Sequence, residues 1–298
     1  MRRLFMKKNV LKAGYLNEDF KIFYLNTPNF NQTIDSHYHD FQKVLIFLGG
    51  TIRYIVEGKE YLLQPGDIVL IDAGELHRPI ADAPTAYERV ILYLSPAFFD
   101  TCPGTDPDAP DLSYCFSYAR RHQTNRIRLS DTGQRSLEPV VRALISSSRD
   151  NAFATPLFQH IKVIEYLILL CRILLNETPV VPPETSLHPT VQTILHLINH
   201  SLTEPLSIDR IAKHCFLDRS YIMHLFKAET GCTIGTYITE KRLFLARHYM
   251  MEGFSVTDAC FKSGFNNYGS FYHAYKKKYH ASPKTAVSDI LPTHILPE

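Results

Sequence analysis

The first hundred residues alternate between short apolar runs and turn residues, which is the pattern of β-structure. The runs are rich in β-branched and aromatic side chains, and Gly49-Gly50, Pro65-Gly66 and Gly74 stand between them. Regular spacing of this kind predicts an antiparallel β-sandwich or barrel. The predicted strands are Lys21–Leu25, Lys43–Leu48, Thr51–Val56, Glu60–Leu63, Ile68–Ile71 and Glu88–Leu94.

After residue 128 the apolar positions recur at steps of three and four, which is the period of amphipathic helices. One face combines Leu137, Val140, Val141, Leu144 and Ile145. A second combines Leu157, Ile161, Ile164, Ile168, Cys171 and Leu175. Such a helix pair can pack on the β-structure or against its copy in a second chain, and the pattern leaves both open. Residues 100–128 show no clear period.

A Pro-rich stretch, Thr178-Pro-Val-Val-Pro-Pro183, then predicts a semi-extended linker between two domains. After it, Val191, Ile194 and Ile198 begin the first helix of a second, helical domain.

One small helical pattern occurs twice in that second domain. The first copy runs from Ser207 to Lys227 and the second from Ser255 to Lys276, with one additional residue in the turn of the second. Each copy reads as helix, tight turn, helix. Ala212 and Cys260 supply the small side chain where the two helices approach, and Gly264 supplies the bend of the second copy. Leu217 and Phe265 are predicted to cap the two apolar seams.

The outward positions of each second helix carry side chains that can reach base edges and phosphates. The predicted DNA-binding residues are Arg219, Ser220, Tyr221, His224 and Lys227 in the first copy, and Asn266, Asn267, Tyr268, Ser270, Tyr272, His273, Lys276 and Lys277 in the second. The alternative is a packed helical domain with a solvated face. Two helix-turn-helix patterns in tandem favour the DNA-binding interpretation.

The stretch from Gly264 to Pro283 resembles the signature of the AraC/XylS family of bacterial transcriptional regulators, and Tyr237, Arg242 and Ala246 fit its linking helix. Tyr275 stands where that family usually has Phe, and His280 where it usually has Gly. The resemblance implies binding to double-stranded promoter or operator DNA, homodimerisation, and activation through RNA polymerase, although some members repress.

Two further motifs resemble the half-motifs of the cupin fold: His37-Tyr-His39 with Lys43, and Pro65-Gly-Asp through His77. Metal-binding cupins have Glu where this chain has Lys43, and a protonated lysine cannot ligate a metal. We therefore expect no metal and no cofactor, although three histidines could hold zinc with one open position.

A small β-barrel can instead enclose one small ligand. The predicted ligand-binding residues are His37, His39, Lys43, Tyr54, Glu75, His77 and Arg78, with Tyr38 as an alternative stacking face. Lys43 and Arg78 could also form structural ion pairs with Glu75 or Asp72.

Composition changes this picture little. The chain has 298 residues and a net charge of +2, with a slight positive excess in the helical half. No apolar run has the length of a membrane helix and no secretory signal is apparent, so we expect a cytoplasmic protein. Six cysteines without close-pair spacing indicate reduced thiols. Redox sensing through Cys102 and Cys115 is an alternative use of two of them.

The sequence thus predicts an α+β protein of two domains. Residues 1–128 form a cupin-like effector domain, 129–177 a helical dimerisation segment, 178–189 a linker, and 190–290 the DNA-binding domain. We expect a sequence-specific regulator rather than an enzyme, controlled by a small molecule, with a sugar as the leading candidate by resemblance. The rivals are a ligand-independent regulator whose β-domain only dimerises, and a metal-dependent cupin enzyme.

Overall fold

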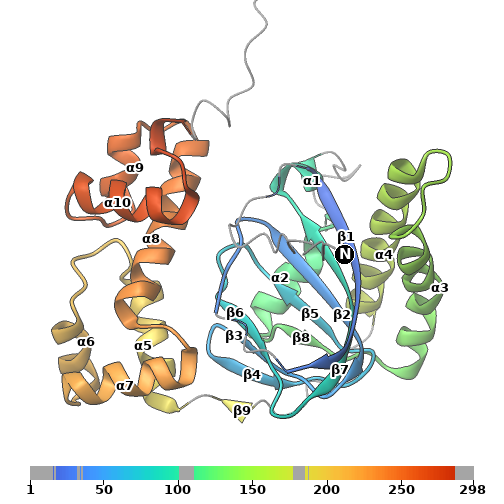
Figure 1. The fold of residues 1–298 in the computed structure, drawn as a ribbon, viewed down its shortest axis with the longest axis horizontal. Coiled ribbons are helices and arrows are strands. Elements are labelled where there is room, and N and C mark those ends of the chain that lie inside the picture. The colour runs from blue at the N-terminus through green and yellow to red at the C-terminus, as the bar shows by residue number, and fades with distance from the viewer. Residues whose placement is uncertain are drawn as a thin grey trace, which may run out of the picture.

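The computed structural model describes residues 16, 18–31, 34, 36–100, 111–176, 185, 186 and 188–285. Strands dominate the N-terminal half and helices make up the C-terminal part, with helix α8 lying beside the β-domain (Figure 1). The predicted α+β architecture with two domains is confirmed. No helix in these ranges is long and apolar enough to cross a membrane.

Two antiparallel sheets form the β-domain. The first has the order β1-β7-β2-β5-β8 and the second β6-β3-β4-β9. The strands are β1 (Phe20–Phe30), β2 (Gln42–Gly50), β3 (Arg53–Val56), β4 (Lys59–Leu62), β5 (Ile68–Ile71), β6 (His77–Ile80), β7 (Thr85–Leu94), β8 (Arg126–Ile127) and β9 (Thr185–Ser186).

Strand β2 shows how alternation assigns side chains to two faces. Val44 and Ile46 join the apolar core under the helices, whereas Leu45 and Phe47 join the core between the two sheets. Lys43 has the same parity as Leu45 and Phe47, so it lies on the inner face. A lysine is therefore buried inside the β-domain, where it is 4% exposed.

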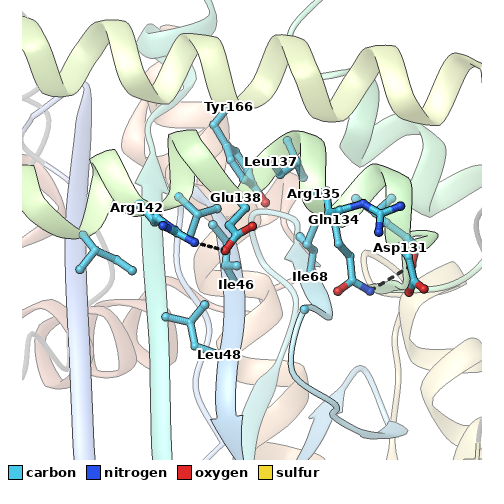
Figure 2. Close-up of a pocket in the computed structure, with 14 residues that line it drawn as sticks. Ile46, Leu48, Ile68, Asp131, Gln134, Arg135, Leu137, Glu138, Arg142 and Tyr166 are labelled. Carbon is cyan, nitrogen blue, oxygen red and sulfur yellow. Dashed lines mark hydrogen bonds and ion pairs between the residues drawn. The ribbon is translucent and has the colours of Figure 1, made fainter.

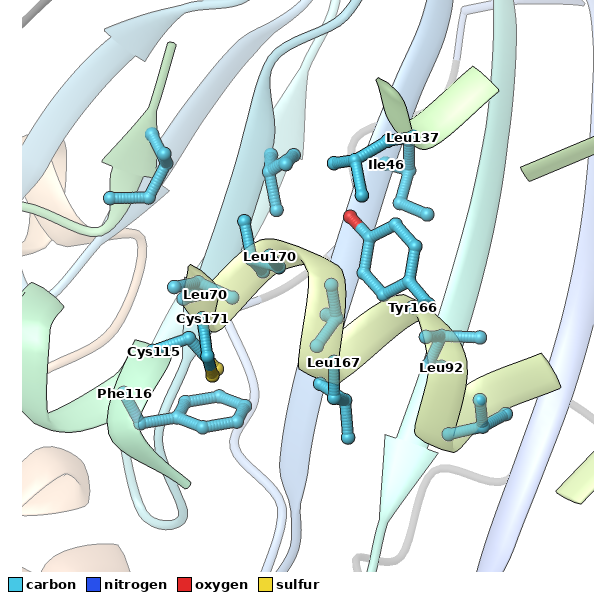
Figure 3. Close-up of a cluster of buried hydrophobic side chains, with 14 of the residues drawn as sticks. Ile46, Leu70, Leu92, Cys115, Phe116, Leu137, Tyr166, Leu167, Leu170 and Cys171 are labelled. Atoms are coloured by element: carbon cyan, nitrogen blue, oxygen red, sulfur yellow. The ribbon is translucent and has the colours of Figure 1, made fainter. Parts of the chain in front are cut away.

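Helices cover the outer face of the first sheet. They are α1 (Pro96–Asp100), α2 (Tyr114–Arg121), α3 (Asp131–Ser147) and α4 (Thr155–Asn176). Figure 3 shows Leu167 and Leu170 of α4 packed over Ile46, Leu70 and Leu92 of the sheet. Helix α2 and strand β8 lie in the stretch that has no clear period, because elements this short contain too few apolar positions to establish one.

The buried side of α4 differs from the predicted stripe. The core takes Val163, Tyr166, Leu167, Leu170 and Leu174. From the predicted stripe, Leu157, Ile161 and Leu175 are 60%, 51% and 53% exposed, and only Cys171 is buried. Helix α4 is apolar on more than one side. Periodicity therefore identified an apolar stripe but could not show which apolar side is buried.

The linker returns to the β-domain before the helical domain begins. Its residues Thr185 and Ser186 form β9, which pairs with Glu60 and Lys59 of β4. The helical domain then comprises α5 (Pro189–His200), α6 (Ile208–Cys215), α7 (Arg219–Thr230), α8 (Ile234–Met251), α9 (Val256–Lys262) and α10 (Tyr268–Tyr279).

Side-chain caps start these helices where the sequence places Ser, Asp, Thr or Asn. Ser207 and Ser255 cap α6 and α9, Asp218 and Asn267 cap α7 and α10, and Thr233 caps α8. Each cap satisfies a backbone N–H that has no partner within its helix. Both predicted helix-turn-helix units are therefore present, as α6–α7 and α9–α10.

The turns of the two units differ. Gly264 has φ +95°, and a Cβ there would lie 2.6 Å from the carbonyl oxygen of Leu202, so the predicted glycine requirement is met. In the first unit Phe216 takes the left-handed conformation with φ +54°, and it is 93% exposed. Phe265 closes its seam at 8% exposure, whereas Leu217 is 38% exposed and covers its seam only partly.

Candidate DNA-binding surface and ligand site

Helices α7 and α10 each keep one face in the core and one in solvent. In α7, Ile222 and Phe226 are buried, while the predicted readers Arg219, Ser220, Tyr221, His224 and Lys227 are all exposed. In α10, Phe271, Tyr275 and Tyr279 are buried. The predicted readers Asn266, Asn267, Ser270, His273, Lys276 and Lys277 are exposed, and Tyr268 and Tyr272 are half-buried.

Two of these residues have roles within the fold. The side-chain oxygen of Asn267 accepts a hydrogen bond from the backbone N–H of Ser270 at 2.8 Å, which caps α10. The Arg219 guanidinium donates to both carboxylate oxygens of Asp209, at 2.9 and 3.2 Å. The cap leaves the amide nitrogen of Asn267 available for contact with DNA. Arg219 would have to leave Asp209 to make such a contact.

The C-terminal turns of α7 and α10 differ in positive charge. The last turn of α10 carries Lys276, Lys277 and Lys278, whereas that of α7 carries Lys227 alone. Cations at a helix C-terminus are favoured by the helix dipole, and they also suit phosphate contact. Helix α8 joins the two units, and its buried residues Leu243, Ala246 and Met250 pack with the second unit.

Five of the predicted ligand residues converge inside the β-domain. The rings of His37, His39 and His77 lie 4.5 to 5.1 Å apart, centroid to centroid. Lys43 Nζ donates to the hydroxyl of Tyr54 at 3.0 Å and lies 3.3 Å from Nε2 of His77. We call His37, His39, Lys43, Tyr54 and His77 the histidine-lysine cluster.

Burial keeps this cluster largely uncharged. It lowers the pKa of His39 and of His77 well below the usual value, and the charge of Lys43 acts in the same direction. Burial, followed by the charge of Arg89, lowers the pKa of Lys43 to about 7. Nδ1 of His77 donates to the carbonyl oxygen of Glu75 at 2.9 Å, so Nε2 presents its lone pair to the cluster.

The three histidines can be tested as a metal site on geometry. One ligand atom of each lies within 4.8 Å of the others, and Nε2 of His39 is buried without a hydrogen-bond partner in the described structure. These features fit a divalent ion. Lys43 does not fit it, because its Nζ occupies the lone pair of His77 that a metal would need.

The other predicted ligand residues lie elsewhere. Glu75 accepts from the backbone N–H of Asp72 and from the amide of Asn125, and burial raises its pKa to about 7. Arg78 points toward the helical domain and donates to the carbonyl oxygen of Glu229 at 3.2 Å. Asp72 pairs with Arg120. Of the two structural ion pairs considered for Lys43, neither is formed.

Cys115, one of the two redox candidates, is buried beside Cys171, and both thiols approach the carbonyl oxygen of Leu112. Cys102 lies outside the described residues.

An interface between the domains is the feature that sequence reasoning missed. Glu57 of the β-domain forms an ion pair with Lys241 of α8 at 2.6 Å and accepts from the hydroxyl of Tyr237. Burial favours the neutral acid, but the charge and hydrogen bond of Lys241 outweigh it, and the pKa of Glu57 is lowered. Asp40 pairs with Arg247, also of α8, at 2.7 Å.

Glycine permits close approach at two points of this interface. Gly231 ends α7 with φ +81°, and a Cβ there would lie 2.3 Å from Nη1 of Arg78. Gly74 has φ +82°, and a Cβ there would lie 2.9 Å from the ring of Phe244 in α8. These glycines are far apart in sequence, and only the folded structure shows that both lie at the contact between the two domains.

One segment, residues 36–40, faces both the cluster and the helical domain. His37 and His39 belong to the histidine-lysine cluster. The intervening residues point the other way: Ser36 donates to the carbonyl oxygen of Thr230, and the Tyr38 hydroxyl donates to that of Glu240 at 2.7 Å. A shift of this segment would therefore act on both sides at once.

Two family profiles match the chain, one in each domain. A family profile described as an AraC-like ligand binding domain matches residues 23–155, and one described as a helix-turn-helix domain matches residues 211–288. The protein named probable transcriptional regulator LumQ, of Photobacterium leiognathi, is 25% identical over 268 residues, which is 87% of this chain and 96% of LumQ.

The HTH-type transcriptional activator RhaS of Shigella sonnei is 23% identical over 256 residues, covering 83% of this chain and 85% of RhaS. Among solved structures, an apo variant of ToxT from Vibrio cholerae aligns with 92% of this chain and 99% of its own. That alignment has 13% identity and a TM-score of 0.37.

A ligand-binding β-domain followed by tandem helix-turn-helix units defines a DNA-binding transcriptional regulator. The chain belongs to the AraC/XylS family of such regulators.

Proposed function

We propose that the protein is an activator whose affinity for DNA is controlled by a small molecule bound at the histidine-lysine cluster. The observation that carries the proposal is the two-faced segment 36–40. Its odd-numbered residues His37 and His39 meet the cluster, and Ser36, Tyr38 and Asp40 meet the helical domain. A ligand can regulate only by binding one arrangement of the domains better than another, and this segment gives it a way to do so.

The cluster is closed in the arrangement seen here, which sets the direction of the proposed coupling. His39, Lys43 and His77 are 6%, 4% and 1% exposed, and Lys278 of α10 is near enough to lower the pKa of His39. A ligand therefore enters more easily when the segment moves away from the helical domain. Binding would favour the arrangement in which α8 is released.

A sugar is the first effector class to test. Neutral imidazoles accept hydrogen bonds, Lys43 donates them, and the Tyr54 hydroxyl does both, so the cluster matches the hydroxyl groups of a sugar. The domain boundaries in this proposal are 1–128 for effector binding, 129–177 for dimerisation, 178–189 for the linker and 190–290 for DNA binding.

The proposed partners are operator DNA, RNA polymerase and a second copy of this chain. Leu157, Ile161 and Leu175 of α4 form an exposed apolar stripe, which suits an isologous contact between two identical chains. The proposed readers of DNA are the residues predicted from the sequence, on α7 and on α10 with the two asparagines before it. Two such helices tied by α8 would enter the major groove about one helical turn apart. A regulator of chromosomal DNA would work in the cytoplasm, and the proposal includes no catalysis.

The test measures operator affinity of the full chain with and without candidate effectors, after the operator has been selected from genomic fragments. An effector should change the affinity of the wild type by tenfold or more and should not change that of Lys43→Met. If no sugar or other metabolite alters either DNA affinity or thermal stability, the dimerisation-only interpretation of the β-domain is preferred.

The convergence of His37, His39 and His77 favours one alternative, a regulator that senses a divalent metal. Thermal unfolding with zinc, nickel or cobalt, and with a chelator control, separates the two. We expect little stabilisation in the wild type, because Lys43 occupies the site. The substitution Lys43→Glu should create strong, chelator-reversible stabilisation, since it restores the carboxylate found in metal-binding cupins.

A further inference from the structure

A cavity of about 480 Å³ lies on the outer face of the first sheet, beneath α3. Its walls are apolar: Ile46 and Leu48 of β2, Ile68 of β5, and Leu137, Val141 and Ile145 of α3. Figure 2 shows α3 running across the sheet, with Ile46, Leu48 and Ile68 on the side of the sheet and Leu137 on the side of α3. The volume falls within the range of about 300–1,000 Å³ that small-molecule sites occupy.

Tyr166 contributes the polar group of this cavity. It reaches from α4 toward Leu137 and Ile46, and the whole side chain is buried (Figures 2 and 3). Its hydroxyl has no hydrogen-bond partner among the described residues. Burial raises the pKa of Tyr166 well above the usual value, so the hydroxyl stays protonated and can donate.

An unpartnered buried hydroxyl is costly, because folding removes its water without replacing the hydrogen bond. A phenylalanine at this position would fill the same space without that cost. The hydroxyl is therefore a feature that packing does not require, and it is placed where a molecule in the cavity could accept its hydrogen bond.

The mouth of the cavity carries both signs of charge. Glu138 and Arg142 form an ion pair across one turn of α3, and Asp131 and Arg135 lie near its start. Equal numbers of acidic and basic groups select neither an anion nor a cation. The occupant is then selected by the apolar walls and by the buried Tyr166 hydroxyl, since the amide nitrogen of Gln134 already donates to the carbonyl oxygen of Leu129.

We propose that this cavity binds a small, neutral, mostly apolar molecule with one hydrogen-bond acceptor, such as a ketone or ester carbonyl, held by the Tyr166 hydroxyl. The site is separate from the histidine-lysine cluster, because Ile46 and Lys43 lie on opposite faces of β2. It does not depend on the proposed effector site, and the two can fail independently.

The first test needs no ligand and compares two buried tyrosines. Tyr61 is also fully buried, but its hydroxyl accepts from the backbone N–H of Asn125 at 3.0 Å. We expect Tyr166→Phe to leave the melting temperature unchanged or raised, and Tyr61→Phe to lower it. A clear drop for Tyr166→Phe would show that its hydroxyl is satisfied within the fold and would overturn the proposal.

The second test uses acetophenone and ethylbenzene, which share a phenyl ring and a two-carbon chain and differ in the carbonyl oxygen. Methyl NMR of the full chain should show acetophenone shifting Ile46, Leu48, Ile68, Val141 and Ile145. Tyr166→Phe should weaken acetophenone binding about tenfold, the loss of one hydrogen bond, and leave ethylbenzene binding unchanged. Val141→Phe, which fills the cavity, should abolish both.

Three outcomes would reject the proposal. The first is an absence of shifts at these methyl groups, and the second is equal acetophenone affinity in wild type and Tyr166→Phe. The third is a set of shifts that depends on protein concentration without any probe, which would mean that a second copy of the chain covers the cavity.

Discussion

The two helix-turn-helix units share a plan but differ in charge and in what holds them. In the first unit the cap of α7 is the charged Asp218, and Arg219 is paired with Asp209. In the second the cap of α10 is the neutral Asn267, and three lysines end the helix. Each unit has one cation paired within the protein, Arg219 with Asp209 and Lys278 with Glu240. We expect the second unit to bind phosphate better, because Lys276 and Lys277 remain exposed.

Their contacts with the β-domain also differ. The end of α7 and the start of α8 meet it through Thr230, Gly231, Tyr237 and Lys241, including the buried ion pair with Glu57. The second unit meets it through Lys278, whose ammonium lies 4.5 Å from the centre of the Tyr38 ring, and the adjoining part of α8 meets it through the ion pair of Arg247 with Asp40. Both units are therefore tied to the β-domain, and the first has additional hydrogen bonds at the carbonyl oxygens of Glu229 and Thr230. We expect regulation to act mainly there.

The largest expected effect on stability comes from the turns of the two helix-turn-helix units, which should respond oppositely to substitution. Gly264→Ala places a Cβ against the carbonyl oxygen of Leu202 at a positive φ, and we expect a loss of roughly 3 kcal/mol in unfolding free energy. Phe216→Gly should have the opposite sign, a gain of up to about 1 kcal/mol, because Phe216 is exposed and in the left-handed conformation. Urea unfolding measures both, and effects of the same sign would contradict this account of the turns.

The next effect tests how firmly each unit is held. Lys241→Met leaves the buried Glu57 carboxylate without its cation, and we expect a cost of about 2–3 kcal/mol. Lys278→Met should cost less, about 1 kcal/mol, because its ion-pair partner Glu240 is more exposed than Glu57 and its contact with Tyr38 is a cation–π interaction. Combining Lys241→Met with Glu57→Gln should recover part of the loss. If the two substitutions lowered the unfolding free energy equally, the β-domain would not hold the first unit more firmly than the second.

Base discrimination should weaken by about 1–3 kcal/mol when a reader is removed from either unit. Arg219→Ala tests the first unit. Asn267→Asp tests the second while keeping an oxygen to cap α10, which Asn267→Ala would lose. The measurement is the ratio of operator to non-specific affinity at one salt concentration. A ratio unchanged in both variants would show that these residues do not read bases.

The smallest effect concerns phosphate contacts. Lys277→Ala should weaken binding to all sequences alike and make the slope of log affinity against log salt shallower by about 0.9. Lys227→Ala is the matched change in the first unit, where we expect a smaller effect because α7 has one lysine in its last turn. A steeper loss for Lys227→Ala would reverse the assignment of phosphate binding to the second unit.

Much of the architecture could be predicted from local patterns. Strands β1 to β5 and β7, both helix-turn-helix units and the exposure of their outward residues follow from periodicity, caps and the requirement for Gly264. His280, where the family usually has glycine, illustrates the limit of residue-type rules: the chain still takes φ +56° there. Helix α2 and strands β6, β8 and β9 were not predicted, because each is too short for a period to appear.

The candidate ligand site was predictable in part. Alternation places Lys43 inside, and the motif spacing brings His37, His39 and His77 together. Arg78 is included in the same predicted site, and in the structure it directly follows His77 in strand β6. Adjacent residues of a strand point to opposite faces, and Arg78 accordingly reaches the helical domain.

By itself, the sequence determined most helices and strands, and which side chains share a face of each. Helix and strand periods, caps and turn residues act over only a few positions, so they can be recognised without the fold. The tertiary structure decided which side of α4 is buried, that Glu57 meets Lys241, that Tyr166 lies unpartnered beside a cavity, and that residues 36–40 join the two domains. These features depend on contacts between residues far apart in the chain. Their energies arise from burial and pairing, which exist only once the elements have packed.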